Sequence, residues 1–272
     1  EFDDKFKVTE KMQKRYDITI NNAREFLKEC DSQKVNFHPI GVVQAWSPNS
    51  MKRASRELID MGYDYIAIGG LVPLDVNSCE EIVKAVRDEI GYEVRIHLLG
   101  FAKAKQLQRF VKYKITSFDS TSPLIRAFKD KKDNYYTPKE HYTAIRIPSS
   151  QKTAALKRKI SSGLVSQDEA ERLEEKALFS IRGYDSGEES LENTLKALEE
   201  YELIFRDKVP IQSYKDILSS KYWQKCQCEV CQNAKIETII FRNSNRNRRR
   251  GFHNLWQFQR ELEELREVNN IC

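Results

Sequence analysis

Three cysteines and a histidine near the C-terminal end of the sequence have the spacing of a metal site. Cys226, Cys228 and Cys231 form a Cys-x-Cys-x2-Cys cluster, and His253 follows after twenty-one residues. Thiolates and an imidazole suit Zn2+, and four such ligands complete a tetrahedron with no position left for a substrate. The spacing predicts a structural zinc site that fastens a terminal helix to the cluster; the alternative is three unligated thiols near an unrelated histidine. The remaining histidines lack such partners and are expected in core or surface roles: His38, His97 and His141.

Small and polar residues recur where four short apolar runs of the sequence end. The residues at these ends are Gln44, Gly69 and Gly70, Leu99 and Gly100, and Asp119. An amide, a carboxylate and backbone free of side chains are the ingredients of a binding or catalytic edge. Ordinary structural explanations stay open for each position, such as a tight turn at the glycines or an aspartate that caps a turn.

The elements that must position these residues follow a regular alternation. Strands are predicted at 39–44, 65–68, 94–98 and 115–119, and helices at 48–61, 78–90 and 102–113, after an opening helix at 6–30. Short buried strands that alternate with such helices indicate βαβ units and a parallel sheet. Sites lie at the C-terminal ends of the strands in a (β/α)8 TIM barrel, which the placement favours. A doubly wound sheet shares this property, and periodicity does not separate the two.

The sequence contains only four such units, which is about the C-terminal half of a barrel. Half a barrel leaves two open strand edges and an uncovered core face, both of which are costly. We expect the missing half to come from sequence beyond this chain or from a partner chain. The first residue is Glu1 and not methionine, so the chain is expected to begin inside a domain.

Beyond the last strand the pattern changes, and three parts are predicted. They are the barrel half at 1–148, a helical insertion at 149–221, and a zinc-binding subdomain with a C-terminal helix at 222–272. The insertion is rich in Glu and Lys, and such charge runs are usually solvated helix faces. Contact with a macromolecular substrate is the alternative for these charges.

Basic side chains gather in two places that could contact phosphates. One follows Asp119, and the other is RNSNRNRRR at 242–250, ahead of an amphipathic helix at 252–268. Cations bind the nucleic-acid backbone regardless of sequence, and a solvated loop is the competing explanation. The nucleic-acid-binding candidates are Arg126, Lys129, Arg246, Arg248, Arg249 and Arg250.

The composition narrows the classes of protein that are compatible with these predictions. The chain has 272 residues, 40% apolar and 32% charged, with a mild formal net charge of +5. No apolar run approaches membrane-spanning length, and the charged opening residues do not resemble a signal peptide. A tight cysteine cluster favours metal over disulfides and a reducing, cytoplasmic compartment.

Five segments, in order, resemble motifs of the tRNA-guanine transglycosylase family. They are GVVQAW (41–46), YDYIAIGGLVPL (63–74), HLLGFAKAKQL (97–107), ITSFDSTSP (115–123), and CQCEVCQNAK (226–235) with GFHNLWQFQREL (251–262). The resemblance covers residues 1–126 and 222–268 and leaves the helical block without a counterpart. It implies a TIM barrel of the transglycosylase type and a structural Zn2+ on the Cys3His cluster.

The resemblance also implies a role for each strand end. Asp119 is the nucleophile that attacks the sugar C1′ as guanine leaves, so that a covalent glycosyl intermediate forms. Gln44 reads the base edge with its amide. Gly69 and Gly70 allow the backbone to approach the base, and Leu99 and Gly100 form an apolar wall. Arg126 lies near the sequence position at which the tRNA enzymes have an arginine that contacts nucleic acid.

Two departures from the family pattern bear on activity and substrate. A second catalytic aspartate and a further base-reading aspartate belong to family segments that this chain lacks, so we expect no activity from it in isolation. The segment at 118–136 and the helical block are more similar to DNA-modifying relatives that insert 7-deazaguanine bases. DNA is therefore the favoured partner, with tRNA as the alternative. The insertion is a candidate for holding distorted DNA around a flipped base.

Two other classes of function compete with a transglycosylase. A non-catalytic supporting subunit needs no nucleophile, which argues against it. A zinc-dependent nucleic-acid-binding module explains the cysteines and arginines but not the residues at successive strand ends. Which deazaguanine base is used, the sequence context and the oligomeric state do not follow from the sequence.

Overall fold

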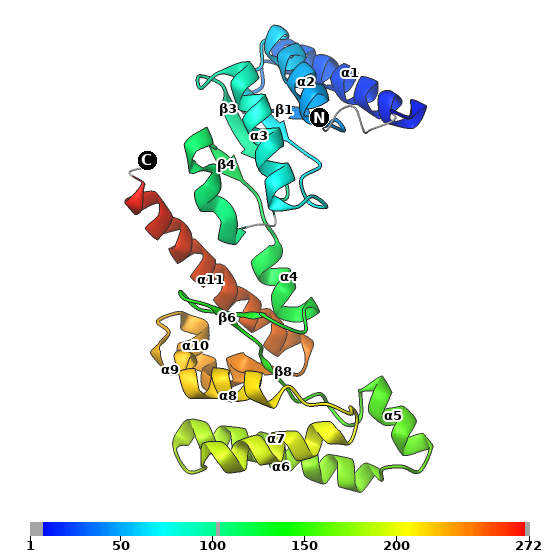
Figure 1. Cartoon of the computed structure of the whole chain (residues 1–272), viewed down its shortest axis with the longest axis vertical. Coiled ribbons are helices and arrows are strands. Elements are labelled where there is room, and N and C mark those ends of the chain that lie inside the picture. The colour runs from blue at the N-terminus through cyan, green and yellow to red at the C-terminus, as the bar shows by residue number, and fades with distance from the viewer. Residues whose placement is uncertain (1–7, 102–103, 270–272) are drawn as a thin grey trace. The chain divides into compact units, whose positions relative to one another are not determined.

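The computed structural model describes residues 8–101 and 104–269. The chain divides between Thr121 and Ser122 into two compact units, which we call unit 1 and unit 2. Figure 1 shows the elements of both along the chain. In the described part, no helix combines the length and apolar character needed to span a membrane.

Unit 1 is built on a four-stranded parallel sheet. Its strands are β1 (Gly41–Val43), β2 (Tyr65–Ile68), β3 (Arg95–Leu98) and β4 (Ser117–Phe118), and they pair in chain order. The predicted parallel sheet is thereby confirmed. A doubly wound sheet contains a point where strand order reverses, whereas these strands follow one another without a reversal, as they do around a barrel.

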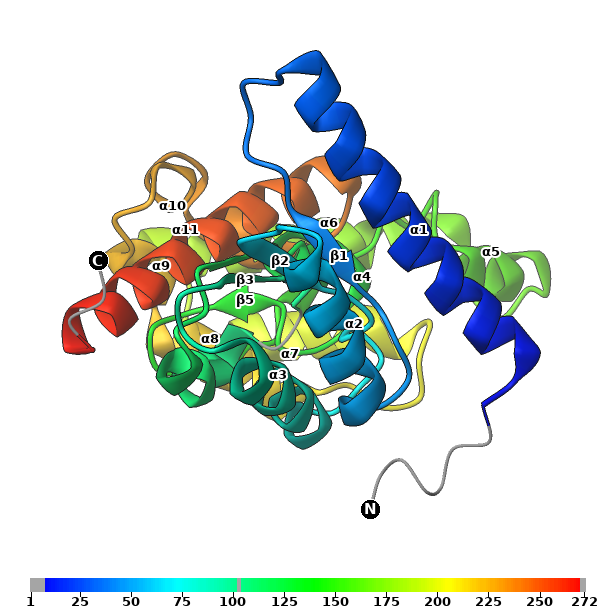
Figure 2. The same ribbon diagram turned by 90° about the horizontal axis from the view of Figure 1, so that it is seen from above.

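Helices cover one face of this sheet. They are α1 (Glu10–Gln33), α2 (Pro48–Asp60), α3 (Val76–Ile90) and the 3₁₀ helix η2 (Ala104–Tyr113). α1 packs on α2 and β1, α2 packs on α3, and α3 packs on η2; Figures 1 and 2 both show α2 beside α3. Ser47 caps α2 as the sequence predicts, because its hydroxyl accepts from the Ser50 backbone in a capping box.

The two faces of the sheet differ in burial because alternate residues of a strand point to opposite sides. On the helix-covered face Ile66, Ile68, Ile96 and Leu98 are fully buried. The opposite face includes the partly exposed side chains of Tyr65, Arg95, His97 and Ser117. This second face is polar and is less buried than the first.

Unit 2 begins with α4 (Ser122–Lys129), which packs along the long helix α11 (Ser244–Val268). The hairpin strands β5 (Tyr135–Tyr136) and β6 (His141–Tyr142) follow, and β7 (Ile145–Arg146) pairs in parallel with β8 (Ile240–Phe241). Because α4 packs on α11, residues 122–148 belong to unit 2, whereas the sequence-based division groups them with the barrel half.

Between β7 and β8 lie the predicted helical insertion and the cysteine cluster. The insertion forms four helices, α5 (Ala154–Ser161), α6 (Gln167–Ser186), α7 (Leu191–Leu203) and α8 (Ile211–Ser220). The cluster region forms α9 (Tyr222–Lys225), α10 (Glu229–Ala234) and the 3₁₀ helix η3 (Lys235–Ile239). Helices and cluster share one hydrophobic core, which includes Tyr201, Tyr214 and Trp223.

α11 starts eight residues earlier than the amphipathic pattern indicates. Asn243 is its N-cap, and its side-chain oxygen accepts a hydrogen bond from the Arg246 backbone. The basic stretch therefore forms the first turns of a helix and is not a loop. This helical geometry points successive arginines in different directions, toward solvent or toward the core.

Candidate active site and metal centre

Asp119 follows β4 at the C-terminal edge of the sheet. Its Oδ1 accepts a hydrogen bond from the Gly100 N–H at 2.9 Å and lies 3.2 Å from Nε2 of His97. The Gly100 N–H is the main cause that lowers the pKa of Asp119, and the His97 contact adds to it. The side chain is 55% exposed. The result is an ionised and accessible carboxylate whose orientation is fixed, as a nucleophile requires.

Gly100 owes its identity to backbone geometry. Its φ is +62°, and a Cβ at this position would lie 3.0 Å from Cγ2 of Val72. L-residues rarely adopt such a φ. The family resemblance implies that Gly100 forms an apolar wall with Leu99; the structure shows in addition that its N–H donates to Asp119.

Three neighbouring strand ends converge at Gly69. A Cβ added there would lie 3.7 Å from Cδ1 of Leu99 and 3.9 Å from Cβ of Gln44. The Gly69 N–H donates to the Val43 carbonyl at 2.9 Å, which ties the ends of β1 and β2 together. Gln44 and Gly70 are exposed and Leu99 is half-buried. The predicted base-binding residues thus lie at one edge of the sheet, with Gly69 leaving space between two of them.

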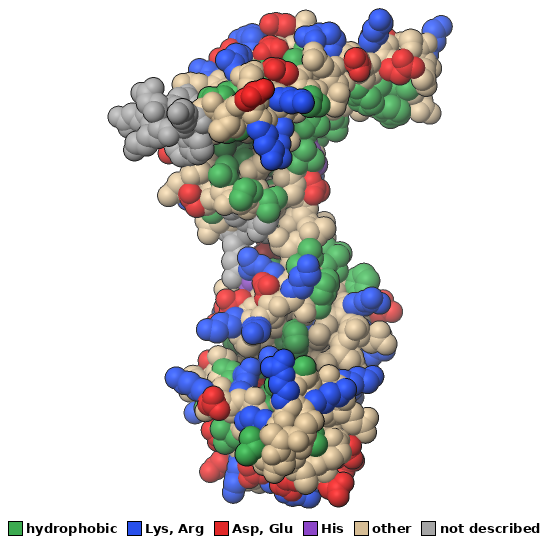
Figure 3. Space-filling view, turned by 90° about the vertical axis from the view of Figure 1, so that its right-hand side faces the viewer, with side chains coloured by type: hydrophobic (Ala, Val, Ile, Leu, Met, Phe, Trp, Pro, Cys, Tyr) green, Lys and Arg blue, Asp and Glu red, His purple; other side chains and the backbone are tan. Residues whose placement is uncertain are grey.

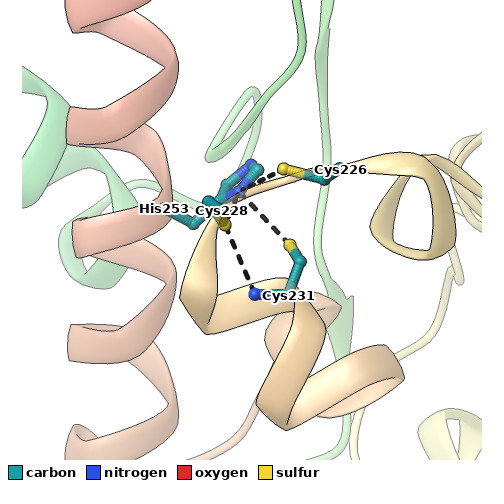
Figure 4. Close-up of side chains that lie close together, drawn as sticks. All are labelled: Cys226, Cys228, Cys231 and His253. Carbon is teal, nitrogen blue, oxygen red and sulfur yellow. Dashed lines mark hydrogen bonds between the residues drawn. The ribbon is translucent and has the colours of Figure 1, made fainter.

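Unit 2 brings together the four predicted metal ligands. The sulfurs of Cys226, Cys228 and Cys231 and a ring nitrogen of His253 all lie within 4.8 Å of one another, and Figure 4 shows them converging from α11 and the segment around α10. The three Sγ–Nδ1 distances are 3.6, 3.3 and 3.3 Å. A tetrahedron with zinc bonds of ~2.3 Å to sulfur and ~2.0 Å to nitrogen has a sulfur–nitrogen edge of about 3.5 Å. The donor set fits a four-coordinate metal.

Surrounding groups orient the ligands. His253 Nε2 donates to the Tyr136 carbonyl at 2.8 Å, which leaves Nδ1 as the ligand atom. The Tyr135 ring stacks on the imidazole with centroids 4.3 Å apart. The Cys231 N–H lies 3.3 Å from the Cys228 sulfur. All four ligand side chains are buried. This closed arrangement is typical of a structural site, because a catalytic site keeps one position open.

The predicted phosphate-contacting residues differ in how much of each side chain is exposed. Lys129, Arg248 and Arg249 are exposed, and Figure 3 shows Lys and Arg side chains on one face of unit 2. Arg126 is half-buried, with Nε 3.9 Å from the Asp130 carboxylate. Arg246 forms an ion pair with Glu237. The exposed three are the residues that can reach a polyanion without breaking an existing contact.

Arg250 has a different role from the one the sequence suggests. Its guanidinium is fully buried and donates to the backbone carbonyls of Ala127, Thr238 and Ile240. A phosphate therefore has no access to it. The misassignment arises because three arginines in a row look equivalent in sequence, whereas the helix directs only Arg250 inward.

Sequence reasoning also missed a residue beside Asp119. His97 was assigned a core or surface role, yet its Nε2 faces Asp119. The signal was in the strand register: His97 pairs with Ser117, and Asp119 lies two residues after Ser117 and therefore on the same face.

Comparison with known proteins places this geometry in a family context. The sequence model described as queuine tRNA-ribosyltransferase matches residues 2–268. The chain is also 39% identical over 253 residues to a protein of Salmonella montevideo called DNA-guanine transglycosylase. The alignment covers 91% of this chain and 60% of that relative. The chain therefore spans about three fifths of the length of the curated relative it matches.

Proposed function

We propose, because this chain belongs to the queuine tRNA-ribosyltransferase family, that it forms part of a transglycosylase that exchanges guanine in DNA for a 7-deazaguanine base. The observation that carries the proposal is Asp119, held by the Gly100 N–H at the C-terminal edge of a parallel sheet. The name of the relative, DNA-guanine transglycosylase, favours DNA over tRNA. The tRNA reaction is the second candidate, because the family description names a tRNA substrate.

The proposed chemistry consists of two displacements at the sugar C1′. Asp119 attacks this carbon with a carboxylate oxygen as the bond to guanine breaks, and the guanine leaves with the bonding electrons. The incoming base then attacks the same carbon and releases the Asp119 carboxylate. Two displacements retain configuration, as in retaining glycosidases. The departing guanine takes up a proton and the incoming base gives one up, and we propose that a group in the missing half of the barrel exchanges both.

The base itself would lie among the predicted binding residues. The Gln44 amide would pair with the base edge, and the space at Gly69 and Gly70 would allow the backbone to approach the ring. Leu99 would contact the ring face. The exposed Lys129, Arg248 and Arg249 would contact phosphates, and the half-buried Arg126 is a further candidate.

A complete pocket requires more protein than unit 1 provides. The sequential order of β1 to β4 and the polar open face of the sheet suit about half of a (β/α)8 barrel. The remaining length of the relative, or a partner chain, would supply the other half. We propose that the chain has three parts, which are the barrel half, the helical block and the zinc-binding subdomain. Helix α4 belongs with the zinc-binding subdomain, because it packs on α11.

Zinc is the proposed metal of the Cys3His cluster, in a reducing cytoplasmic compartment. When bound it would supply cross-linking and not chemistry, because all four positions are taken by protein ligands. Cys226, Cys228, Cys231 and His253 would hold it, and the Tyr136 carbonyl would keep the imidazole in the ligating tautomer. The cluster cysteines form no disulfide in the structure.

The helical block is proposed to help hold distorted DNA. A base in a duplex must leave the stack before its C1′ can react, and the block adds surface to the zinc-binding unit. Replacing the exposed Lys157 and Arg158 of the block by Glu, which leaves the shared core in place, should weaken DNA binding. Unchanged binding would remove this part of the proposal.

The whole proposal is tested by base exchange in the full-length natural protein. Labelled guanine is followed into duplex DNA and into tRNA, with Asp119→Asn alongside. Exchange into DNA that the substitution abolishes supports the proposal. Exchange into tRNA alone would keep the chemistry and overturn the substrate, and a supporting subunit would show neither while still binding zinc.

A further inference from the structure

A continuous row of hydrogen bonds leads from Asp119 along the open face of the sheet. His97 Nε2 lies 3.2 Å from Asp119 Oδ1, and His97 Nδ1 lies 2.6 Å from the Ser117 hydroxyl. The Ser117 hydroxyl lies 2.5 Å from the Tyr65 hydroxyl. Three different strands contribute these groups, so the sheet itself sets their spacing.

The donors in this row can all point the same way. Asp119 is ionised and only accepts, so the proton between it and His97 belongs to Nε2. A neutral imidazole with its proton on Nε2 accepts at Nδ1, and the Ser117 hydroxyl can donate there. The Tyr65 hydroxyl then donates to Ser117. The row therefore selects one tautomer of His97, as partners of a catalytic imidazole commonly do.

We propose that His97 is a positioning residue for the nucleophile, and that Ser117 and Tyr65 hold it in the donating tautomer. The inference rests on the proposed function and deepens it. The bonds from Gly100 and His97 both fall on Oδ1 of Asp119, which assigns Oδ2 as the oxygen that attacks C1′.

His97 would act differently in the two displacements. A hydrogen bond to a charged oxygen is stronger than one to a neutral oxygen. Asp119 is a neutral ester in the covalent intermediate and regains its charge as it leaves. The His97 N–H therefore favours the second displacement, in which the C1′–Oδ2 bond breaks and the electrons return to the carboxylate. Loss of this donor should cause the covalent intermediate to accumulate.

The test measures base exchange and trapped protein–DNA intermediate in the full-length protein. His97→Leu should lower kcat roughly 10- to 100-fold, the loss expected for one bond to a charged group, with little change in KM. The share of enzyme trapped as intermediate should rise. His97→Gln should recover much of the rate, because its amide can place an N–H near Oδ1.

Two further substitutions examine the rest of the row. Ser117→Ala should lower kcat less than His97→Leu, and Tyr65→Phe less again. Tyr63→Phe is the matched control, because the Tyr63 hydroxyl donates to the Ala23 carbonyl and has no part in the row; its exchange should match the natural protein.

The outcomes separate this inference from the proposed function. An Asp119→Asn protein that still exchanges bases would overturn the nucleophile whatever His97 does. An inactive Asp119→Asn protein beside a fully active His97→Leu protein would overturn the positioning role alone. Equal loss in His97→Leu and His97→Gln, with no trapped intermediate, would show that His97 only fills space.

Discussion

Replacing Arg250 by methionine should destabilise the protein without weakening the proposed contact with DNA. The guanidinium is fully buried and donates to Asn247 Oδ1 at 2.8 Å as well as to the carbonyls of Ala127, Thr238 and Ile240. These bonds fasten α4, η3 and β8 to α11. Methionine fills similar volume but leaves the acceptors unsatisfied.

The size of the effect is a difference between two large terms. Four bonds from a charged donor, at about 2 kcal/mol each, contribute about 8 kcal/mol. Burial lowers the pKa of Arg250 to about 9 from its ordinary 12.5, which corresponds to a burial cost of about 5 kcal/mol. The net loss is about 3 kcal/mol, and it should lower the Tm by about 6 to 12 °C in a protein of this size.

Arg249→Met is the matched control, since Arg249 is next to Arg250 in the sequence but its side chain is exposed. Thermal unfolding should show a change of ~0.5 kcal/mol or less for this variant. In a salt titration of DNA binding, Arg249→Met should reduce the slope by about one while Arg250→Met leaves it unchanged. Equal melting temperatures for the two variants, or a lower salt slope for Arg250→Met, would refute the assignment.

Three other predictions concern the metal, the nucleophile and pH. Cys228→Ser should reduce bound zinc, measured by elemental analysis, and unfold unit 2 at a lower temperature. Cys30→Ser is the control for zinc content, because Cys30 is a buried cysteine of unit 1 and is not one of the clustered ligands; chelation of the natural protein should reproduce the effect of Cys228→Ser. Gly100→Ala should lower base exchange at least about 10-fold, because a φ of +62° costs an L-residue about 1–2 kcal/mol and the N–H to Asp119 would shift; full activity would contradict its role as donor. Glu80 has a pKa lowered to about 2, first by the Lys112 contact, so its stabilising contribution is complete above its unfolded value near 4.5 and is lost as pH falls toward 2. Glu80→Gln should therefore reduce the loss of unfolding free energy between pH 5 and 3, measured by urea unfolding. A pH profile equal to that of the natural protein would show that the Glu80–Lys112 pair contributes nothing to stability.

The parts of the fold that the sequence predicts are those governed by local pattern. The strand at 65–68 and the capped helix after Ser47 follow from burial periodicity and capping chemistry, both of which act within a few residues. The cysteine cluster was equally readable, because ligand spacing is nearly fixed by metal geometry.

The parts that sequence reasoning missed depend on contacts distant in the chain. Arg250 and Arg249 differ only in what α11 packs against, and the Ala127 carbonyl is 123 positions away from Arg250. The role of His97 required the register between β3 and β4, which strand prediction alone does not provide. The hydrogen bond from the Gly100 N–H to Asp119 depends on the positive φ of Gly100, which the sequence alone does not reveal.

The pairing of β7 with β8 has a consequence for how the chain tolerates changes in length. Ile145 pairs with Ile240, so everything from α5 to η3 is a single excursion whose two ends are tied together. The entropy lost in closing a loop grows only with the logarithm of its length, about 0.6 kcal/mol for each doubling. Changes in the length of the turns between these helices should thus cost little in closure entropy, whereas removing the helices would also remove the core that they share with the cysteine cluster.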